Sequence, residues 1–285
     1  MDGLLFFFLV AITITFTIYI SISMVIGFLL LNNLMFWRRK ETLFPFPVEK
    51  KHLSNPIVNY YVAKNSNHKD WVLLLHSYGG KAQTVLNRGK IFWKEGYSLI
   101  FVDARSHGTS PYAREIHALI YAFDVLRILE QERISVPIII QGLSMGGAAA
   151  VILTRCVQVK ALLLEAITSD LTTNFYEMLK YSPFPIKLYK WVPKFIYFYT
   201  RKYSWDKISA KEVLPRYAND IPILLVHCEN DSLYDYNIHF HTLKELLKNN
   251  LYFKCWLVSD LEHTEMSLHP NYSEKILEFI TNLSF

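Results

Sequence analysis

The chain opens with an apolar stretch that is long enough to form a membrane-spanning helix. Residues 4–31 contain no charged side chain, and as a helix they would extend over roughly 40 Å, which exceeds the ~30 Å hydrocarbon core of a bilayer. A cleaved secretory signal would need a basic start and an apolar stretch of only about 7–15 residues, whereas this stretch is longer and follows Asp2. A buried core helix would show a polar face. We therefore predict a transmembrane anchor over residues 4–31.

Basic residues follow the apolar stretch, whereas only Asp2 and the terminal amine precede it. The basic flank consists of Arg38, Arg39, Lys40, Lys50 and Lys51. Because Lys and Arg are retained on the cytoplasmic side of a membrane, the pattern predicts a single-pass membrane protein whose following domain faces the cytoplasm. The three cysteines lie in apolar runs and form no visible disulfide framework, which agrees with this compartment. Residues 32–56 are expected to form a juxtamembrane segment.

From residue 57 onward, short apolar runs alternate with longer amphipathic segments. The short runs are 71–76, 99–103, 136–141, 160–165, 221–227 and 251–258. Each ends in turn-forming or polar residues, which is typical of buried strands in a parallel sheet. Apolar residues recur at helical spacing within 116–129, 240–247 and 276–280. This alternation predicts an α/β fold with a mostly parallel, doubly wound sheet, and we expect residues 57–285 to form that single domain.

One segment, about 171–220, interrupts the alternation and predicts a helical cap insertion over the sheet. It contains no strand pattern, four prolines and many aromatic residues, and its basic residues outnumber the acidic ones. Several aromatics lie too close together in sequence to share one face of a helix: Tyr189, Trp191, Phe195, Tyr197 and Phe198. Either they pack only on the domain, or some face outward beside Lys187, Lys190 and Lys194, which is the pattern of a membrane-interface surface.

The strongest chemical signal lies in residues 138–150, where an apolar strand pattern leads into Gly-Leu-Ser-Met-Gly and then into small residues of a helix. In such a strand–turn–helix, glycines two positions before and after the serine allow close packing, and the hydroxyl of Ser144 projects above the sheet. The helix that follows directs its N-terminus at the site, so the backbone N–H of Met145 could stabilise an oxyanion. Ser144 is therefore the predicted nucleophile.

An acid and a histidine should follow the serine, each after a later strand. The turn after run 221–227 contains Asp231, which we predict to be the acid, while Glu229 and Asp235 remain rivals. The turn after run 251–258 contains His263, the predicted base. His269 lies farther on, before a proline and the final helical segment, which favours a structural role.

Two further loops contain histidines after predicted strands. In His76-Ser77-Tyr78-Gly79-Gly80, the backbone N–H of Tyr78 is the predicted second oxyanion donor, and His76 is expected to be architectural. Asp103 and His107 in the next loop could suggest a metal site, but no cluster with ligand spacing accompanies them. We therefore expect neither a metal nor an organic cofactor.

Taken together, these segments resemble the α/β-hydrolase superfamily, in the group of capped serine hydrolases that holds monoacylglycerol lipases, serine aminopeptidases and prolyl-oligopeptidase-like hydrolases. The resemblance covers about residues 58–285 and rests on five motifs in order: residues 76–80, 103–110, 142–147, Asp231 and His263. It implies an α/β-hydrolase fold with a helical cap and a serine hydrolase activity. Ser77 and Ser106 stand where the family usually has glycine, and a Cβ atom at residue 77 could shift the oxyanion loop.

The predicted function is a serine hydrolase that cleaves carboxylic esters through an acyl-enzyme on Ser144, with lipophilic acyl esters near a membrane as the favoured substrates. A peptidase acting on small peptides would use the same triad, although an acidic cap would suit a peptide amine better than this basic one. A non-catalytic membrane-anchored binding module is the third interpretation, supported by Ser77 and Ser106 alone. The net charge of +5 lies partly at the membrane flank, so no nucleic-acid partner is expected.

Overall fold

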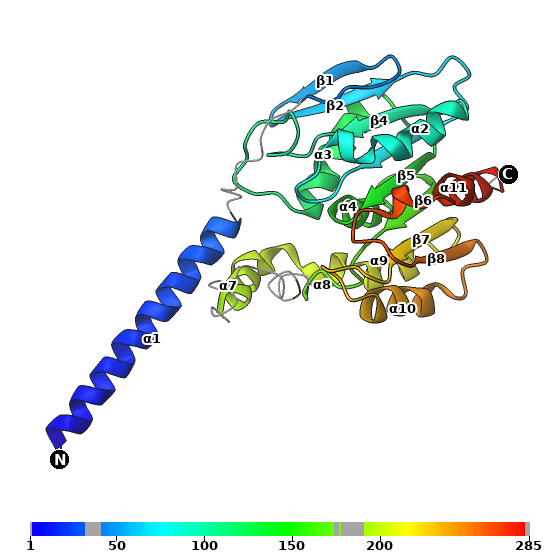
Figure 1. Ribbon diagram of the computed structural model, residues 1–285. Helices are drawn as coiled ribbons and strands as arrows, with labels where there is room; N and C mark the ends of the chain where they lie inside the picture. The colour runs from blue at the N-terminus through cyan, green and yellow to red at the C-terminus, as the bar shows by residue number, and fades with distance from the viewer. Residues whose placement is uncertain (1, 32–40, 174–176, 178–190, 283–285) are drawn as a thin grey trace.

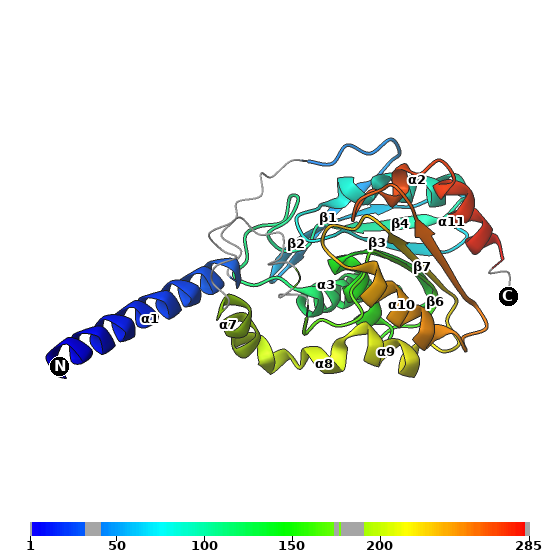
Figure 2. The same ribbon diagram turned by 60° about the horizontal axis from the view of Figure 1, so that its bottom comes forward.

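The computed structural model describes residues 2–31, 41–173, 177 and 191–282. Helix α1 (Asp2–Leu31) projects from the rest of the molecule as one long helix (Figures 1 and 2). Its segment Leu5–Ile26 has a mean hydropathy of 2.4 and by length and composition could cross a membrane, a test that a signal sequence also passes. Its hydroxyls need no water, because Thr13, for example, donates to the carbonyl of Leu9 at 2.8 Å. The predicted N-terminal apolar helix is confirmed.

An eight-stranded, mostly parallel sheet forms the centre of the domain, with the order β1-β2-β4-β3-β5-β6-β7-β8. The strands are β1 (Glu49–Ser54), β2 (Ile57–Ala63), β3 (Trp71–Leu75), β4 (Ser98–Val102), β5 (Ile138–Leu143), β6 (Val159–Glu165), β7 (Ile223–Cys228) and β8 (Phe253–Val258). Strand β2 pairs antiparallel with both β1 and β4, and the remaining pairs are parallel. The six predicted strands correspond to β3–β8, which confirms the predicted fold class.

Strands β1 and β2 were not predicted from the apolar pattern. The sequence of β1, Glu-Lys-Lys-His-Leu-Ser, has only Leu53 buried because β1 is the edge strand of the sheet. Phe44 and Phe46 also pack against the domain, with ring centroids 5.1 Å and 6.3 Å from that of Phe101. The second half of the 32–56 segment therefore extends the sheet and its core. The division of the chain into anchor, juxtamembrane segment and domain stays a prediction.

Helices cover both faces of the sheet, because successive strand residues point to opposite sides. Leu73, Leu75 and Ile140 face one core, while Val72, Leu74 and Ile139 face the other. The first core is closed by α3 (Ala118–Gln131), α4 (Met145–Leu153), α8 (Trp205–Ile208), α9 (Ala210–Tyr217) and α10 (Tyr236–Leu247). The second core is closed by η1 (Ala82–Val85), α2 (Leu86–Lys94), η3 (Met266–Leu268) and α11 (Tyr272–Thr281).

The predicted cap segment, about 171–220, is mostly helical over residues 191–217, while its described residues 171–173 and 218–220 are turn or irregular. Its helical part consists of α7 (Trp191–Thr200), the short η2 (Arg201–Tyr203), α8 and α9. Helix α7 lies against α1 near the end of α1 that meets the domain (Figures 1 and 2), whereas α8 and α9 bury Trp205 and Val213 in the first core. Of the described helices of the cap segment, α7 is therefore the one that packs against α1 and adds no side chain to the first core. Lys187, Tyr189, Lys190 and the side chain of Tyr197 lie outside the described residues.

Candidate active site

Ser144 occupies a sharp turn between β5 and α4. Its φ of 54° and ψ of −114° place the backbone in a region that residues with a Cβ atom rarely adopt. Two backbone bonds hold the turn, because Ser144 N donates to the carbonyl of Glu165 at 2.8 Å and Ala148 N donates to the carbonyl of Ser144 at 2.9 Å. The strained turn is therefore fixed to β6 on one side and to the first turn of α4 on the other.

Glycines around this turn permit contacts that a Cβ atom would prevent. A Cβ atom on Gly142 would lie 2.6 Å from the carbonyl oxygen of Gly146, and one on Gly146 would lie 2.3 Å from that of Leu75. A Cβ atom on Gly147 would lie 2.2 Å from the Cγ2 atom of Ile167. The helix therefore starts in contact with the end of β3, which explains why the motif needs glycine at each of these positions.

The structure brings Ser144, His263 and Asp231 into one hydrogen-bonded chain. His263 Nε2 lies 2.9 Å from Ser144 Oγ, and His263 Nδ1 lies 2.6 Å from Asp231 Oδ2. All three residues are at least nine-tenths buried. They come from the turns after β5, β7 and β8, so the parallel sheet collects them at its carboxyl edge. This geometry allows the histidine to accept the serine proton while the carboxylate orients the ring.

Asp231 is held by both of its oxygens. Oδ1 accepts hydrogen bonds from the backbone N–H groups of Leu233 and Tyr234 at 2.9 and 2.8 Å. Oδ2 contacts His263 and also the Nε2 atom of His227 at 3.2 Å. Burial alone would raise the pKa of Asp231, but the hydrogen bonds from His227 and His263 hold that pKa well below its usual range. The carboxylate is therefore ionised at neutral pH.

The other candidates for the acid and the base have different positions in the structure. Asp235 is the N-cap of α10, where its side chain accepts a hydrogen bond from Asn237 N at 2.9 Å. Glu229 is exposed. His269 packs against Trp256 with a centroid distance of 5.1 Å and accepts a hydrogen bond from Asn271 N at 3.1 Å. Among these candidates, His263 contacts Ser144 and Asp231 contacts His263.

The two predicted oxyanion donors come from segments that the structure brings together. Met145 is the first residue of α4, and the loop that contains Tyr78 follows β3, whose Leu75 pairs with Gly142 of β5. The next residue of α4, Gly146, approaches the backbone of both Leu75 and His76 so closely that a Cβ atom would lie 2.3 and 2.7 Å from their carbonyl oxygens. The start of α4 and the loop after β3 are therefore neighbours.

Two neutral histidines hold this loop. His76 Nε2 accepts a hydrogen bond from Ala104 N at 3.0 Å, and its Nδ1 atom donates to the carbonyl of Ser77 at 2.7 Å. His107 Nε2 accepts from Gly79 N at 2.8 Å, and its Nδ1 atom donates to the carbonyl of Arg105 at 2.7 Å. Burial lowers the pKa of His76 to about 3, with a contribution from His107, and burial also lowers the pKa of His107. Sequence reasoning left the contact between His107 and Gly79 unrecognised.

The two serines at family glycine positions differ in backbone conformation. Ser106 has a φ of 62°, which favours glycine, but its Oγ atom donates to the carbonyl of Ala113 at 3.0 Å and accepts from Ala113 N at 2.8 Å. Ser77 does not adopt a positive φ, whereas Gly79 does, at 78°. The Cβ atom of Ser77 therefore imposes no left-handed strain on the loop.

The Asp103 carboxylate organises the following turn. Its Oδ1 atom accepts from Ala82 N at 2.8 Å, and its Oδ2 atom accepts from Thr109 N at 2.8 Å. Gly108, with a φ of 53°, leaves space for this carboxylate, because a Cβ atom there would lie 2.2 Å from the Asp103 Cγ atom. Within the described residues, no three His, Cys, Asp or Glu side chains gather as a metal site.

A buried ion pair lies next to residues of the triad. Arg88 donates to Glu165 Oε2 through Nε at 2.9 Å and through Nη2 at 2.6 Å, and both side chains are almost fully buried. Gln141 and Tyr272 donate to the other oxygen of Glu165. Arg88 Nη2 also lies 3.4 Å from the carbonyl of Thr264, next to His263. This pair therefore ties α2 and β6 to the loop that carries the histidine, and no sequence pattern predicted it.

A second buried serine–histidine–carboxylate cluster lies at the junction with the cap segment. His239 Nδ1 lies 3.0 Å from Ser169 Oγ and accepts a hydrogen bond from Ser169 N at 3.1 Å. His239 Nε2 lies 2.6 Å from Glu177 Oε2. The ring of Tyr234 contacts both His239 and His263, with centroid distances of 5.6 and 5.0 Å. Sequence reasoning missed this cluster.

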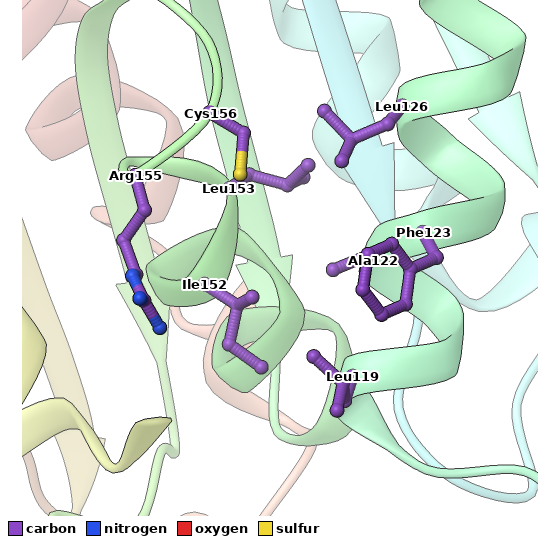
Figure 3. Close-up of a pocket in the computed structure, with 8 residues that line it drawn as sticks. All are labelled: Leu119, Ala122, Phe123, Leu126, Ile152, Leu153, Arg155 and Cys156. Carbon is purple, nitrogen blue, oxygen red and sulfur yellow. The ribbon is translucent and has the colours of Figure 1, made fainter. Parts of the chain in front are cut away.

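An apolar hollow of about 220 Å³ lies between α3 and α4, away from these residues (Figure 3). Leu119, Phe123, Leu126, Ile152 and Leu153 are among the side chains that line it. None of the lining residues belongs to the hydrogen-bonded chain of Ser144, His263 and Asp231. The hollow is therefore separate from the candidate active site.

Comparisons with known proteins give a family and a fold. The family model described as serine aminopeptidase, S33, matches residues 66–250, which is more than half of the chain and includes Ser144 and Asp231 but not His263. A search of the curated proteins finds no match.

Among solved structures, a bacterial membrane phospholipase A is similar, with a TM-score of 0.62 and 15% identity over 99% of this chain and 97% of that one. The Pyrococcus furiosus esterase Pf2001 has a TM-score of 0.64 and 18% identity over 86% of this chain and 97% of its own. A thermophilic esterase from Thermogutta terrifontis has a TM-score of 0.58 and 15% identity over 84% and 100%. At identities of 15–18%, this similarity shows that the chain shares the fold of these proteins and nothing more.

Proposed function

We propose that this chain, which belongs to the serine aminopeptidase family S33 and is a hydrolase of the α/β-hydrolase fold, cleaves carboxylic esters through an acyl-enzyme on Ser144. The observation that supports this most is the unbroken chain from Asp231 Oδ2 through His263 to Ser144 Oγ, with contacts of 2.6 and 2.9 Å. Its position on a strained turn at the start of a helix supports the same role for Ser144.

The proposed reaction has two steps. In the first, Ser144 Oγ forms a bond to the ester carbonyl carbon while His263 Nε2 takes the serine proton; the C–O bond then breaks, and the alcohol leaves with that proton. In the second, water attacks the acyl-enzyme and gives a proton to His263, and Ser144 recovers the proton as the acid departs. The backbone N–H groups of Tyr78 and Met145 would stabilise the oxyanion in both steps.

The family match favours a peptidase as the second candidate, because an amide carbonyl would meet the same triad. A substrate panel separates the two: p-nitrophenyl esters of two to twelve carbons against aminoacyl p-nitroanilides, with the full chain in detergent micelles. We expect turnover of the esters to exceed that of the anilides and to rise with acyl length. Preference for aminoacyl anilides would overturn the ester proposal, and no turnover of either by folded protein would leave only a binding module.

A lipophilic substrate is supported by the way α7 meets α1. Near its C-terminal end, the apolar segment of α1 packs against other parts of the molecule. There Ser23 is buried, and Tyr19, Ile20 and Ile26 are half-buried. Helix α7 contacts α1. If α1 crosses a bilayer, α7 then lies at the depth where hydrocarbon gives way to headgroups.

The exposed face of α7 has the composition that suits such a depth. Trp191 and Phe198 are 40% and 60% exposed. Lys194 Nζ lies 4.4 Å from the ring centroid of Trp191, and the guanidinium carbon of Arg201 lies 4.2 Å from that of Phe198. The four residues, at helical spacings of three and four, form what we term the α7 stripe. Aromatic rings at the hydrocarbon boundary beside cations at anionic headgroups are a stable arrangement.

Charge reversal tests the α7 stripe. Lys194→Glu with Arg201→Glu should reduce turnover of a long-chain ester in anionic vesicles roughly thirtyfold, since the two basic residues each contribute about 1 kcal/mol near such a surface. The variant should turn over a soluble short ester normally. Lys244→Glu with Lys248→Glu, an equal charge change on an exposed residue of α10 and on its exposed C-cap, is the matched control. If both double variants lost long-chain turnover equally, or if the Lys194 and Arg201 variant lost none, the α7 stripe would have no role in binding the membrane surface.

We also propose that the domain faces the cytoplasm, from the basic flank at residues 38–40. Reporter fusions at the C-terminus test this orientation. A reporter active only on the far side of the membrane, or a mature chain that begins near residue 32, would contradict a cytoplasmic domain held by an uncleaved anchor.

A further inference from the structure

His227, at the end of β7, is a second histidine on the triad carboxylate. Its Nε2 atom lies 3.2 Å from Asp231 Oδ2, the same oxygen that contacts His263 Nδ1 at 2.6 Å. The side chain of His227 is completely buried. The motif that predicts Ser144, Asp231 and His263 assigns it no role, and from sequence it belongs to an apolar strand.

The surroundings of His227 determine which nitrogen carries its hydrogen. Nε2 faces two acceptors, the Asp231 carboxylate and, at 3.5 Å, the carbonyl of Tyr234. Nδ1 is buried and has no hydrogen-bond partner within the part of the chain that the structure describes. A hydrogen on Nδ1 would be a buried donor without an acceptor, and a doubly protonated ring would add an incompletely paired charge. The hydrogen therefore belongs on Nε2, which faces the Asp231 carboxylate at 3.2 Å and the carbonyl of Tyr234 at 3.5 Å.

In this arrangement two histidines contact the same carboxylate oxygen, Asp231 Oδ2. Asp231 Oδ1 is occupied by the N–H groups of Leu233 and Tyr234, so the carboxylate cannot rotate without losing bonds. At Oδ2, the polar contact from His227 Nε2 at 3.2 Å draws negative charge away from the hydrogen bond that His263 makes. An imidazolium at His263 is thereby stabilised less than it would be by a carboxylate that it did not share.

We propose that His227 is a positioning residue for the triad: its Nε2–H fixes Asp231 Oδ2 toward His263 and lowers the pH at which His263 becomes available as a base. The inference rests on the proposed roles of Asp231 and His263. It adds a fourth side chain to the site, one that acts through Asp231 and does not touch the substrate.

The other groups near the rings of His227 and His263 do not account for the proposed effect on His263. His227 packs against the ring of Phe240 on α10, at a centroid distance of 6.3 Å, and His263 against the ring of Tyr234. Burial raises the pKa of the Cys228 thiol to about 12, so the thiol remains neutral. Glu262 is exposed and accepts a hydrogen bond from Ser232 N at 3.2 Å. Within the described part of the chain, His227 and His263 are the side chains that the structure places against Asp231 Oδ2.

A pH–rate profile measures the proposed effect. In His227→Leu, the acid limb of kcat/KM for p-nitrophenyl butyrate should move upward by roughly half to one pH unit, because His263 keeps its proton to higher pH. His227→Gln places an amide N–H where Nε2 lies and should return the limb toward that of the native chain. His239→Gln, which removes a buried imidazole that does not contact Asp231, should leave the limb in place.

Two results would overturn the proposal: an unchanged limb in folded His227→Leu, or an equal upward shift in the Leu and Gln variants. Nitrogen-15 NMR of the native chain in micelles provides a test that needs no folded variant. We expect His227 to be neutral from pH 6 to 8 with its hydrogen on Nε2. A charged ring or a hydrogen on Nδ1 in this range would contradict the inference. This measurement uses no substrate, so its failure is distinguishable from failure of the ester hydrolase proposal.

Discussion

Ser144 and Ser169 lie at 2.9 and 3.0 Å from a nitrogen of a buried histidine, and each histidine contacts a carboxylate at 2.6 Å on its other side. The Ser144 cluster and the Ser169 cluster thus contain the same three kinds of group at the same separations. They differ in what surrounds the serine and in how the histidine is already bonded.

The histidine nitrogen beside Ser169 is occupied. His239 Nδ1 accepts the backbone N–H of Ser169 at 3.1 Å, so it has no lone pair left for a serine proton. His263 Nε2, in contrast, contacts the Ser144 hydroxyl. Ser144 also lies on a strained turn at the start of α4. The comparison therefore favours Ser144 as the nucleophile, because its histidine keeps an open ring nitrogen and the serine lies at the start of a helix.

Ser144→Ala should have the largest effect, about a 10⁶-fold loss of kcat on a soluble ester, because the nucleophile itself is removed. His263→Ala should be comparably severe. The exchange is small enough to leave the fold intact, so circular dichroism and thermal unfolding should match the native chain. Turnover of Ser144→Ala within tenfold of native would end the assignment of this serine.

Asp231→Asn should reduce kcat about 10⁴-fold, because an amide can present the wrong partner to His263 and no longer balances its charge. Steady-state kinetics on the same ester measures the loss. Glu229→Gln is the control, because Glu229 is exposed and lies two positions before Asp231 in the same turn; it should change kcat less than threefold. Similar losses in the two variants would mean that the turn is needed for folding and that Asp231 has no special role.

His107→Ala should reduce kcat roughly tenfold with little change in KM, because Gly79 N loses its acceptor and the loop that positions Tyr78 relaxes. His107→Gln can place an oxygen where the ring Nε2 atom lies and should recover most of the loss. A change confined to KM, or no recovery with glutamine, would contradict a role in holding this loop.

Ser169→Ala should have the smallest effect, with kcat within about threefold of native and a loss of stability of about 1 kcal/mol from one hydrogen bond. Glu177→Gln keeps an acceptor for His239 Nε2 and should behave similarly. Urea unfolding and ester turnover measure the two quantities separately. A loss of more than a hundredfold in kcat for Ser169→Ala would make the two clusters functionally alike.

The difference between the clusters also explains what could be predicted from sequence. The turn at Ser144 is local, since a strand, two glycines and a helix within residues 138–150 are sufficient to define it. Asp231 and His263 follow because the turns after parallel strands meet at one edge. Contacts between His239 and Glu177, or His227 and Asp231, depend on how side chains point after folding, and no spacing rule describes them.

The edge strand β1 is a part of the fold that the apolar pattern did not predict. Strand β1 has charged residues at an edge, so it lacks the apolar run that marks a buried strand. Within the predicted cap segment, helices α8 and α9 bury side chains in the first core, a contact that the sequence pattern did not predict. Ser106 does adopt the backbone that favours glycine, as its family position implied, but the hydrogen bonds to Ala113 compensate.

Covalent labelling tests the central claim, that Ser144 is the reactive serine of this chain. The full chain in micelles would be treated with a fluorophosphonate and digested, and the modified peptide would be identified by mass spectrometry. We predict one label per chain, on Ser144, retained in Ser169→Ala and lost in Ser144→Ala. A label on Ser169, or a label that persists in folded Ser144→Ala, would contradict it.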